Sequence, residues 1–104
     1  MGGLGSYNNQ ARITFDKAKR EQTVAERGLD FADAELVFAG VTLEMEDTRK
    51  DYGERRYQAI GMIGEDLHML VFTPRDSGVH VISPRRANQR ERTRYARQAK
   101  PRAD

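Results

Sequence analysis

Apolar positions along the chain follow a two-residue alternation in some segments and gather in short runs in others, and both patterns are typical of strands. Alternation or a compact apolar run marks five segments, at residues 11–16, 41–46, 57–63, 67–73 and 79–83. Short polar connections join the last four of these segments. We therefore predict that they form a four-stranded antiparallel meander, with residues 41–46 as a half-exposed edge strand.

Two helices are predicted between the first two strands. Asp16 is a typical N-cap and Gly28 a typical C-cap for residues 17–27, although that segment has few apolar positions. Asp30 can cap a second helix, whose apolar stripe consists of Phe31, Ala34, Val37 and Phe38. Because the connection between them is short, we expect the two helices to form a hairpin.

The composition changes abruptly after Pro84. Residues that favour a helix follow without glycine or proline until Pro101, and six of them are arginines: Arg85, Arg86, Arg90, Arg92, Arg94 and Arg97. We therefore predict a basic helix directly after the last strand. The expected fold is α+β: a short strand, a two-helix hairpin, the four-stranded antiparallel meander and the C-terminal basic helix.

Length and composition limit the class of protein. A chain of 104 residues is expected to form one domain, here residues 11–98, with a disordered leader at residues 1–10 and a flexible tail at residues 99–104. The absence of cysteine excludes disulfides and zinc–thiolate sites, and with only two histidines we predict no metal site and no cofactor. No apolar stretch is long enough to span a membrane, so a soluble cytoplasmic protein is expected.

Basic charge is concentrated at the C-terminal end. Residues 75–104 carry nine Lys and Arg against three acids, net +6, whereas residues 1–74 carry nine against thirteen, net −4. Such a cluster indicates either a polyanionic partner or a solvated helix face, and charge alone does not separate the two.

Four short motifs occur in a fixed order between about residues 12 and 96. They are Asp16-x-x-Lys19, then Gly28–Leu29–Asp30–Phe31 with Ala34 and Phe38, then Asp51–Tyr52–Gly53–Glu54-x-Arg56 with Ile60–Gly61, and finally Ile82–Ser83-x-Arg85-x-Ala87 with Glu91–Arg92 and Tyr95. In this order and at this spacing they resemble the BrnT family of bacterial toxins. The resemblance implies a ribonuclease toxin of a type II toxin–antitoxin pair, with a RelE-like fold and RNA as its substrate. It also implies a ribbon-helix-helix-like antitoxin as partner, and promoter DNA bound through the toxin–antitoxin complex.

The sequence departs from the family pattern at several positions. Glu26 and Arg27 replace a Lys-His pair that many relatives have, Thr23 replaces asparagine, and Pro84 replaces alanine. His80 stands at a strand position where the family usually has arginine. This last change either retunes the chemistry or weakens it.

Cleavage of RNA through its own 2′-hydroxyl needs a base, cations for the charge that develops on the phosphorus, and a proton donor, but no metal. For charge stabilisation we predict Arg56, Arg85 and Arg92, with Lys19 as an outlying phosphate contact. On the predicted helix Arg85, Asn88 and Arg92 share one stripe, so Asn88 is added as an RNA contact. Arg90, Arg94 and Arg97 fall on the other side and are interpreted as solvated or antitoxin-facing.

Three further side chains, those of His80, Glu54 and Tyr95, have two interpretations each. His80 can act as proton donor or base near neutrality, or it can be a half-buried histidine beside Ile82. Glu54 is a candidate general base, or it pairs with an arginine. Tyr95 is a candidate for base stacking, but its more ordinary role is to anchor the basic helix. His68 is interpreted as a packing residue.

Three functions follow from these features. The first is a metal-independent ribonuclease toxin with Glu54, Arg56, His80, Arg85 and Arg92 as catalytic residues. The alternatives are a nucleic-acid-binding module without catalysis, and an inactive toxin relative that acts through partner binding.

Overall fold

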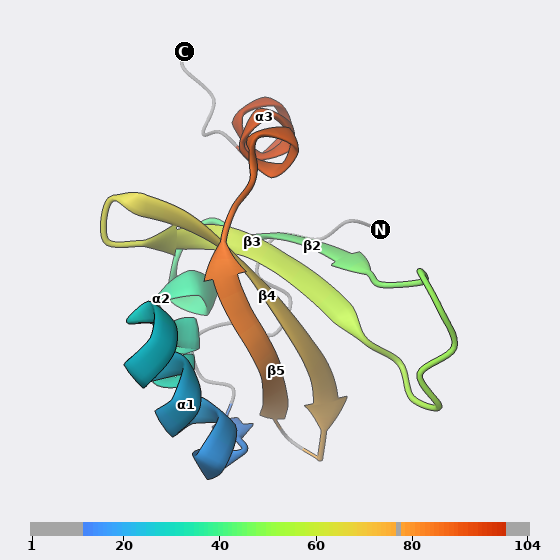
Figure 1. The fold of residues 1–104 in the computed structure, drawn as a ribbon. Helices are drawn as coiled ribbons and strands as arrows, with labels where there is room; N and C mark the ends of the chain where they lie inside the picture. Colours follow the sequence, from blue (N-terminus) through green and yellow to red (C-terminus); the bar gives the residue numbers. More distant parts are fainter. Residues whose placement is uncertain (1–11, 77, 100–104) are drawn as a thin grey trace.

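The computed structural model describes residues 12–76 and 78–99, and these form a sheet with helices on both of its faces (Figure 1). The elements are β1 (Arg12–Phe15), α1 (Lys17–Arg27), the 3₁₀ turn η1 (Phe31–Asp33), α2 (Ala34–Ala39), β2 (Leu43–Glu46), β3 (Tyr57–Ile63), β4 (Asp66–Arg75), β5 (Gly78–Arg86) and α3 (Gln89–Gln98). The α+β class is confirmed. The predictions for the leader and for residues 100–104 of the tail lie outside the described residues.

The sheet has five strands in the order β1-β5-β4-β3-β2. β2 to β5 pair antiparallel with their neighbours in the chain, whereas β1 pairs parallel with β5, so the sheet is mixed. The predicted four-stranded sheet was therefore incomplete, because the alternation in residues 11–16 says nothing about which strand they pair with. Gly78 allows β1 to approach, since a side chain there would collide with the carbonyl oxygen of Arg12.

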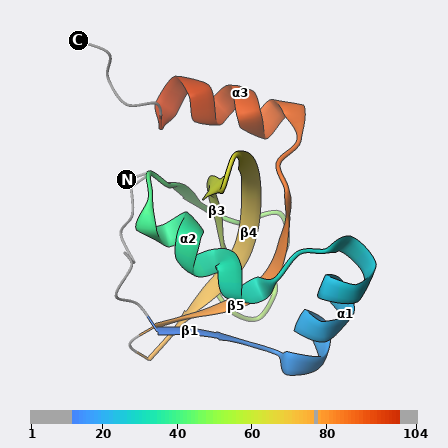
Figure 2. The ribbon, with the colours of Figure 1, turned by 90° about the vertical axis from the view of Figure 1, so that its left-hand side faces the viewer.

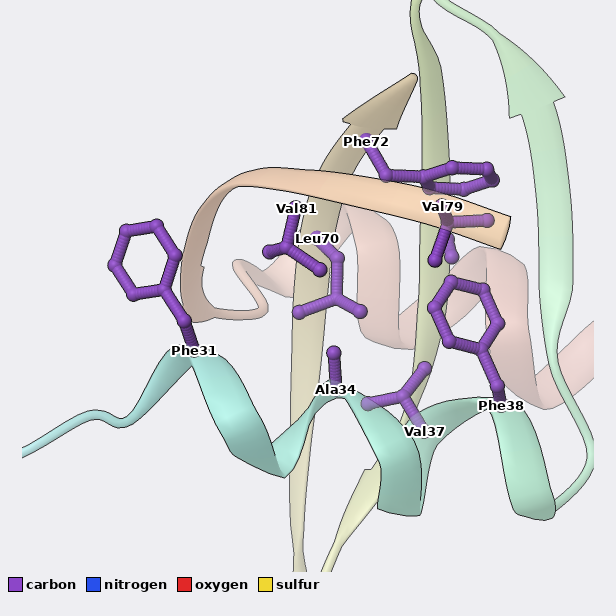
Figure 3. Close-up of a cluster of buried hydrophobic side chains, with 9 residues drawn as sticks. Phe31, Ala34, Val37, Phe38, Leu70, Phe72, Val79 and Val81 are labelled. Atoms are coloured by element: carbon purple, nitrogen blue, oxygen red, sulfur yellow. The ribbon is translucent and has the colours of Figure 1, made fainter. Parts of the chain in front are cut away.

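One face of the sheet packs against η1 and α2. Side chains from these two elements point onto β4 and β5 and form a buried cluster with them (Figure 3), comprising Phe31, Ala34, Val37, Phe38, Ala59, Leu70, Phe72, Val79 and Val81. The helical stripe predicted from Asp30 onward is confirmed, although its first turn is a 3₁₀ helix. α2 lies close to β3 because Gly61 has no side chain, and a Cβ there would come within 2.9 Å of Val37.

The opposite face packs against α3, which lies across one end of the sheet (Figures 1 and 2). A second apolar cluster fills this layer, with Leu43, Ile60, Leu67, Met69, Val71, Ala87 and Ala99 at its centre and Met45, Ile82 and Tyr95 at its margin. α3 contributes few of these side chains, so its attachment also depends on polar contacts.

The two N-terminal helices do not form the predicted hairpin. α1 has the predicted caps, with Asp16 accepting a hydrogen bond from the Lys19 amide and Gly28 in the left-handed conformation. Its polar surface leaves Thr23 as its only buried residue, and α1 projects to the side while α2 covers the sheet (Figure 2). Without an apolar stripe on α1, the two helices have nothing to bury against each other. In the described part of the chain, no helix is long and apolar enough to cross a membrane.

β2 is an edge strand, as predicted, but of the polar side of residues 41–46 only Glu46 is exposed. Thr42 and Glu44 are both buried, and the Thr42 hydroxyl donates to the Val37 carbonyl at 2.6 Å. The strict alternation in residues 41–46 had predicted that one face of this strand is exposed to solvent. α2 and α3 cover opposite faces of the sheet at this edge, so both sides of the strand are enclosed here.

Candidate functional site

The predicted stripe of Arg85, Asn88 and Arg92 on one helix is wrong. β5 runs through Pro84 to Arg86, with Arg85 opposite Met69 on β4, and α3 begins only at Gln89. Arg85 therefore projects from a strand rather than from the helix. Helix propensity in this segment was overridden by the pairing of β5 with β4.

The Arg85 side chain makes a bidentate ion pair with Glu91, at 2.9 and 2.7 Å. Asn88 is the N-cap of α3: its side chain accepts from the Glu91 amide, and Glu91 accepts from the Asn88 amide. Burial raises the pKa of Glu91, but the hydrogen bonds from Arg85 and Asn88 outweigh it and hold the pKa below its ordinary value. This Arg85 junction (Arg85, Asn88 and Glu91) fastens the first turn of α3 to the end of β5.

The other two candidates on α3 differ in their surroundings. The Tyr95 hydroxyl donates to the Val41 carbonyl at 2.8 Å, and its ring borders the second apolar cluster, as expected of an anchor. Arg92 is exposed, and within the described residues no carboxylate lies at ion-pair distance from it. Arg92 is thus available to a ligand, whereas Tyr95 is engaged in holding the helix.

His80 lies at the other end of the same sheet face, beyond α3. It is opposite Thr14 on β1 and Thr73 on β4, and the Thr14 hydroxyl is 2.9 Å from its Nδ1. Because side chains alternate along β4, Thr73 faces the same side as Met69 and Val71, which pack in the layer under α3. His80 is half-buried, and Thr14 fixes the orientation of its ring.

Four charged groups lie near enough to affect the ionisation of His80. Burial is the main reason that the pKa of His80 is below its ordinary value; Arg75 and Lys19 lower it further, while Glu54 and Asp16 oppose them. The imidazole is therefore mainly neutral at pH 7, as a proton acceptor must be.

Glu54 joins two guanidinium groups beside His80. It lies 3.3 Å from Arg56 and 3.8 Å from Arg75, and the Arg56 guanidinium stacks on the Tyr52 ring at 4.2 Å. This geometry is compatible with Glu54 as a general base and with Glu54 as an ion-pair partner of arginine. The structure shows the ion pairs. We refer to Lys19, Glu54, Arg56, Arg75 and His80 as the His80 cluster.

A buried carboxylate fixes the loop that carries Glu54 and Arg56. Asp47 accepts two hydrogen bonds from the Arg49 guanidinium, at 2.8 and 2.7 Å, and one from the Tyr52 hydroxyl. Its amide donates to the Arg56 carbonyl at 2.7 Å, which closes the loop at its base. The hydrogen bond from Arg49 is the main reason that the pKa of Asp47 falls from 3.8 to about 2.

Replacing Asp47 by asparagine is expected to lower the free energy of unfolding at pH 7 by about 1 kcal/mol, a value discounted because Arg49 is largely exposed. A lowered carboxyl pKa stabilises the fold above pH 4, and this contribution is lost as the pH falls from about 4 to about 2. Urea unfolding at pH 7, 4 and 2.5 will test this. The loss in the Asp47→Asn variant should shrink toward pH 2.5, and a loss that is constant with pH would contradict the assignment.

A groove of about 240 Å³ opens beside Thr14, the hydrogen-bond partner of His80. It is lined by Arg12, Thr14, Arg75, Asp76, Gly78 and Val79. The sequence interpretation missed Thr14 and Arg75, because they approach His80 only through the parallel pairing of β1 with β5 and the extension of β4. The only available signal was the position of Arg75 in the turn before the His80 strand.

The candidate residues thus divide into two groups. His80, Glu54, Arg56 and Lys19 gather at the open end of the sheet face, whereas Arg85 and Asn88 belong to the junction that holds α3. The first group places the imidazole of His80 near cations, an arrangement that can deprotonate a hydroxyl and bind a phosphodiester. The second has most of its polar atoms already paired.

Comparison with known proteins bears on the kind of site this is. A search of curated proteins finds no match to the chain. The family model described as "Ribonuclease toxin, BrnT, of type II toxin-antitoxin system" matches residues 15–91, well over half of the sequence, and this range includes every member of the His80 cluster. The chain therefore belongs to the BrnT family of ribonuclease toxins of type II toxin–antitoxin systems.

Proposed function

We propose that this protein is a metal-independent endoribonuclease toxin whose active site is the His80 cluster. The observation that carries the proposal is the half-buried imidazole of His80, whose Nδ1 lies 2.9 Å from the Thr14 hydroxyl, with Lys19, Arg75 and Glu54 near enough to affect its ionisation. His80 would take the proton of the ribose 2′-hydroxyl. Lys19, Arg56 and Arg75 would stabilise the charge that develops on the phosphate, with Glu54 holding the two guanidinium groups in place.

The bond changes follow from this arrangement. The 2′-oxygen attacks the adjacent phosphorus, the bond to the 5′-oxygen breaks, and that oxygen takes a proton from water. The products are a 2′,3′-cyclic phosphate and a 5′-hydroxyl. Arg92 remains a proposed phosphate contact outside the cluster, while Arg85 and Asn88 are assigned to positioning α3.

The test is cleavage of RNA by the purified chain in the presence of EDTA. We expect products with 2′,3′-cyclic phosphate ends, and no cleavage at a position where 2′-deoxyribose has been substituted. Cleavage that requires Mg²⁺, or equal cleavage of DNA, would contradict the proposal.

A non-catalytic function is a second candidate, because two of the three predicted catalytic arginines are committed to ion pairs and His80 replaces the arginine usual in the family. In that case the chain would bind RNA in a salt-sensitive way without breaking it. Wild-type protein that binds RNA but leaves it intact under all metal conditions would favour this alternative.

Membership of a type II family implies an antitoxin partner. We propose, from the resemblance, that the antitoxin is ribbon-helix-helix-like, that the complex binds promoter DNA, that the toxin acts in the cytoplasm and that its architecture is RelE-like. Co-expression with the neighbouring small gene should abolish growth arrest if this pairing is correct.

A further inference from the structure

The outer surface of α3 carries three arginines that the cleavage mechanism does not use. They line a shallow groove of about 390 Å³, here called the α3 groove, together with two uncharged polar residues: Arg90, Thr93, Arg94, Arg97 and Gln98. From sequence these arginines were interpreted as solvated or antitoxin-facing.

These arginines differ from most others in having no acidic partner. Within residues 12–76 and 78–99, seven arginines lie within 4.0 Å of a carboxylate, and none of the three is among them. Glu91 is the only acid in α3, and its carboxylate is taken by Arg85. The groove is therefore a concentrated positive surface, in which Arg94 alone of the three lies near enough to the Glu91 carboxylate to affect its pKa.

Helix stability does not explain the placement of Arg90 and Arg94, whereas Arg97 in the last turn interacts favourably with the helix dipole. Arg90 lies in the first turn, where a cation opposes the helix dipole, and Arg94 follows one turn later, where a like charge is mildly destabilising. Arg90 and Arg97 are separated by seven residues, or about 10 Å along the axis, a length that suits two or three successive phosphates. A polyanion bound in the α3 groove would offset the repulsion between these arginine side chains.

The positive charge of the α3 groove does not continue into the neighbouring loop. Arg94 extends from α3 to Met45 on the edge strand β2, with its Nη1 2.9 Å from the sulfur. Beyond Met45, the loop after β2 forms a second hollow of about 390 Å³, whose lining carries four acids against three cations: Glu46, Asp47, Asp51 and Glu54 against Lys50, Arg55 and Arg56. The net positive surface therefore ends at α3 in this direction.

We propose that the α3 groove binds the sugar–phosphate backbone of the RNA substrate away from the scissile bond. This inference rests on the proposed ribonuclease function. RNA is favoured over an acidic protein segment because the groove lining is entirely polar and offers none of the apolar or aromatic anchors that protein interfaces use. Guanidinium forks match phosphate oxygens.

The test compares two variants with equal loss of charge. Arg90→Gln/Arg97→Gln removes two exposed groove cations without cutting the Arg94–Met45 contact, and Lys17→Gln/Arg27→Gln removes two exposed cations from α1. The binding probe is a 2′-O-methyl RNA of about 20 nucleotides, which cannot be cleaved. Cleavage is measured separately on a long RNA and on a dinucleotide too short to reach α3.

We expect the groove variant to bind the probe about three- to tenfold more weakly at 0.1 M salt, with a salt slope lower by about 1.4, while the control is unchanged. Its KM for long RNA should rise, with turnover of the dinucleotide unaltered. If probe binding matches that of the control, the proposal is overturned, and it is equally overturned if only inhibition by the antitoxin is lost. If the wild-type chain cleaves no RNA yet probe binding depends on Arg90 and Arg97, the ribonuclease assignment fails and the groove assignment stands.

Discussion

Replacing His80 by alanine is expected to reduce the rate of RNA cleavage by about 10²- to 10⁴-fold, the range typical for loss of a general base. His80 is a half-buried residue on a strand that is paired on both sides, so the backbone should not depend on its ring. The same variant should relieve growth arrest when expressed without antitoxin. Unchanged thermal unfolding would show that the loss is chemical.

The pH profile provides a more specific signature of this base. Because the pKa of His80 is lowered, kcat/KM should rise with pH through a midpoint below 6.5 and reach a plateau by neutrality. The other of the two histidines in the sequence, His68, serves as a control. It is buried, and its Nδ1 lies 2.9 Å from the Asp66 carbonyl oxygen. A His68→Gln variant should keep the acid limb, and the residual activity of His80→Ala should lack it.

Arginine at position 80 separates the interpretations of this residue. A His80→Arg variant cannot act as a base at neutral pH, so it should be nearly as impaired as His80→Ala if proton transfer is the role of this residue. Higher activity with arginine than with histidine would instead identify a charge-stabilising position. In that outcome the natural chain would be a family member with reduced activity, which corresponds to the alternative of an inactive toxin relative.

Local sequence signals predicted those elements whose boundaries depend on local chemistry. The caps of α1 at Asp16 and Gly28, and the central strand Tyr57–Ile63, are as predicted, because a capping residue and an apolar run act within a few residues of themselves. The α2 stripe was likewise evident from its spacing. The burial of Thr42 and Glu44 was not evident from the sequence, because alternation does not reveal which elements cover each face of a strand.

The candidate site could be predicted only in part, for a related reason. Glu54, Arg56 and Lys19 came from the motifs and His80 from a departure from the family pattern; in the structure Glu54 pairs with Arg56, and Glu54 and Lys19 lie near enough to His80 to affect its pKa. Thr14 and Arg75 were missed because their proximity to His80 depends on strand pairing between distant segments. Arg85 was assigned to a helix because arginine is a good helix former, while the pairing of β5 with β4 at Met69 kept it extended.

Replacing Arg85 by alanine is expected to destabilise the protein by about 2 kcal/mol. The change leaves Glu91 without its partner, and the Glu91 side chain is only 11% exposed, so an uncompensated charge remains in a mostly enclosed position. We discount the 3–5 kcal/mol typical of fully buried pairs because the Arg85 side chain is 37% exposed. Urea denaturation at pH 7 measures the loss, and Arg86→Ala, whose pair with Asp66 is well exposed, should cost less than about 1 kcal/mol.

A paired replacement tests whether Arg85 acts through structure or through charge. Arg85→Met/Glu91→Gln removes both charges at once, retains an amide that can serve the N-cap, and should recover most of the stability lost in Arg85→Ala. If Arg85 only fastens α3 to β5, this double variant should cleave RNA within about threefold of wild type, because the α3 groove and the His80 cluster are then restored together. A stable, folded double variant that has lost cleavage would show that the Arg85 guanidinium contacts the reacting phosphate, and the active site would have to extend from His80 to the end of β5.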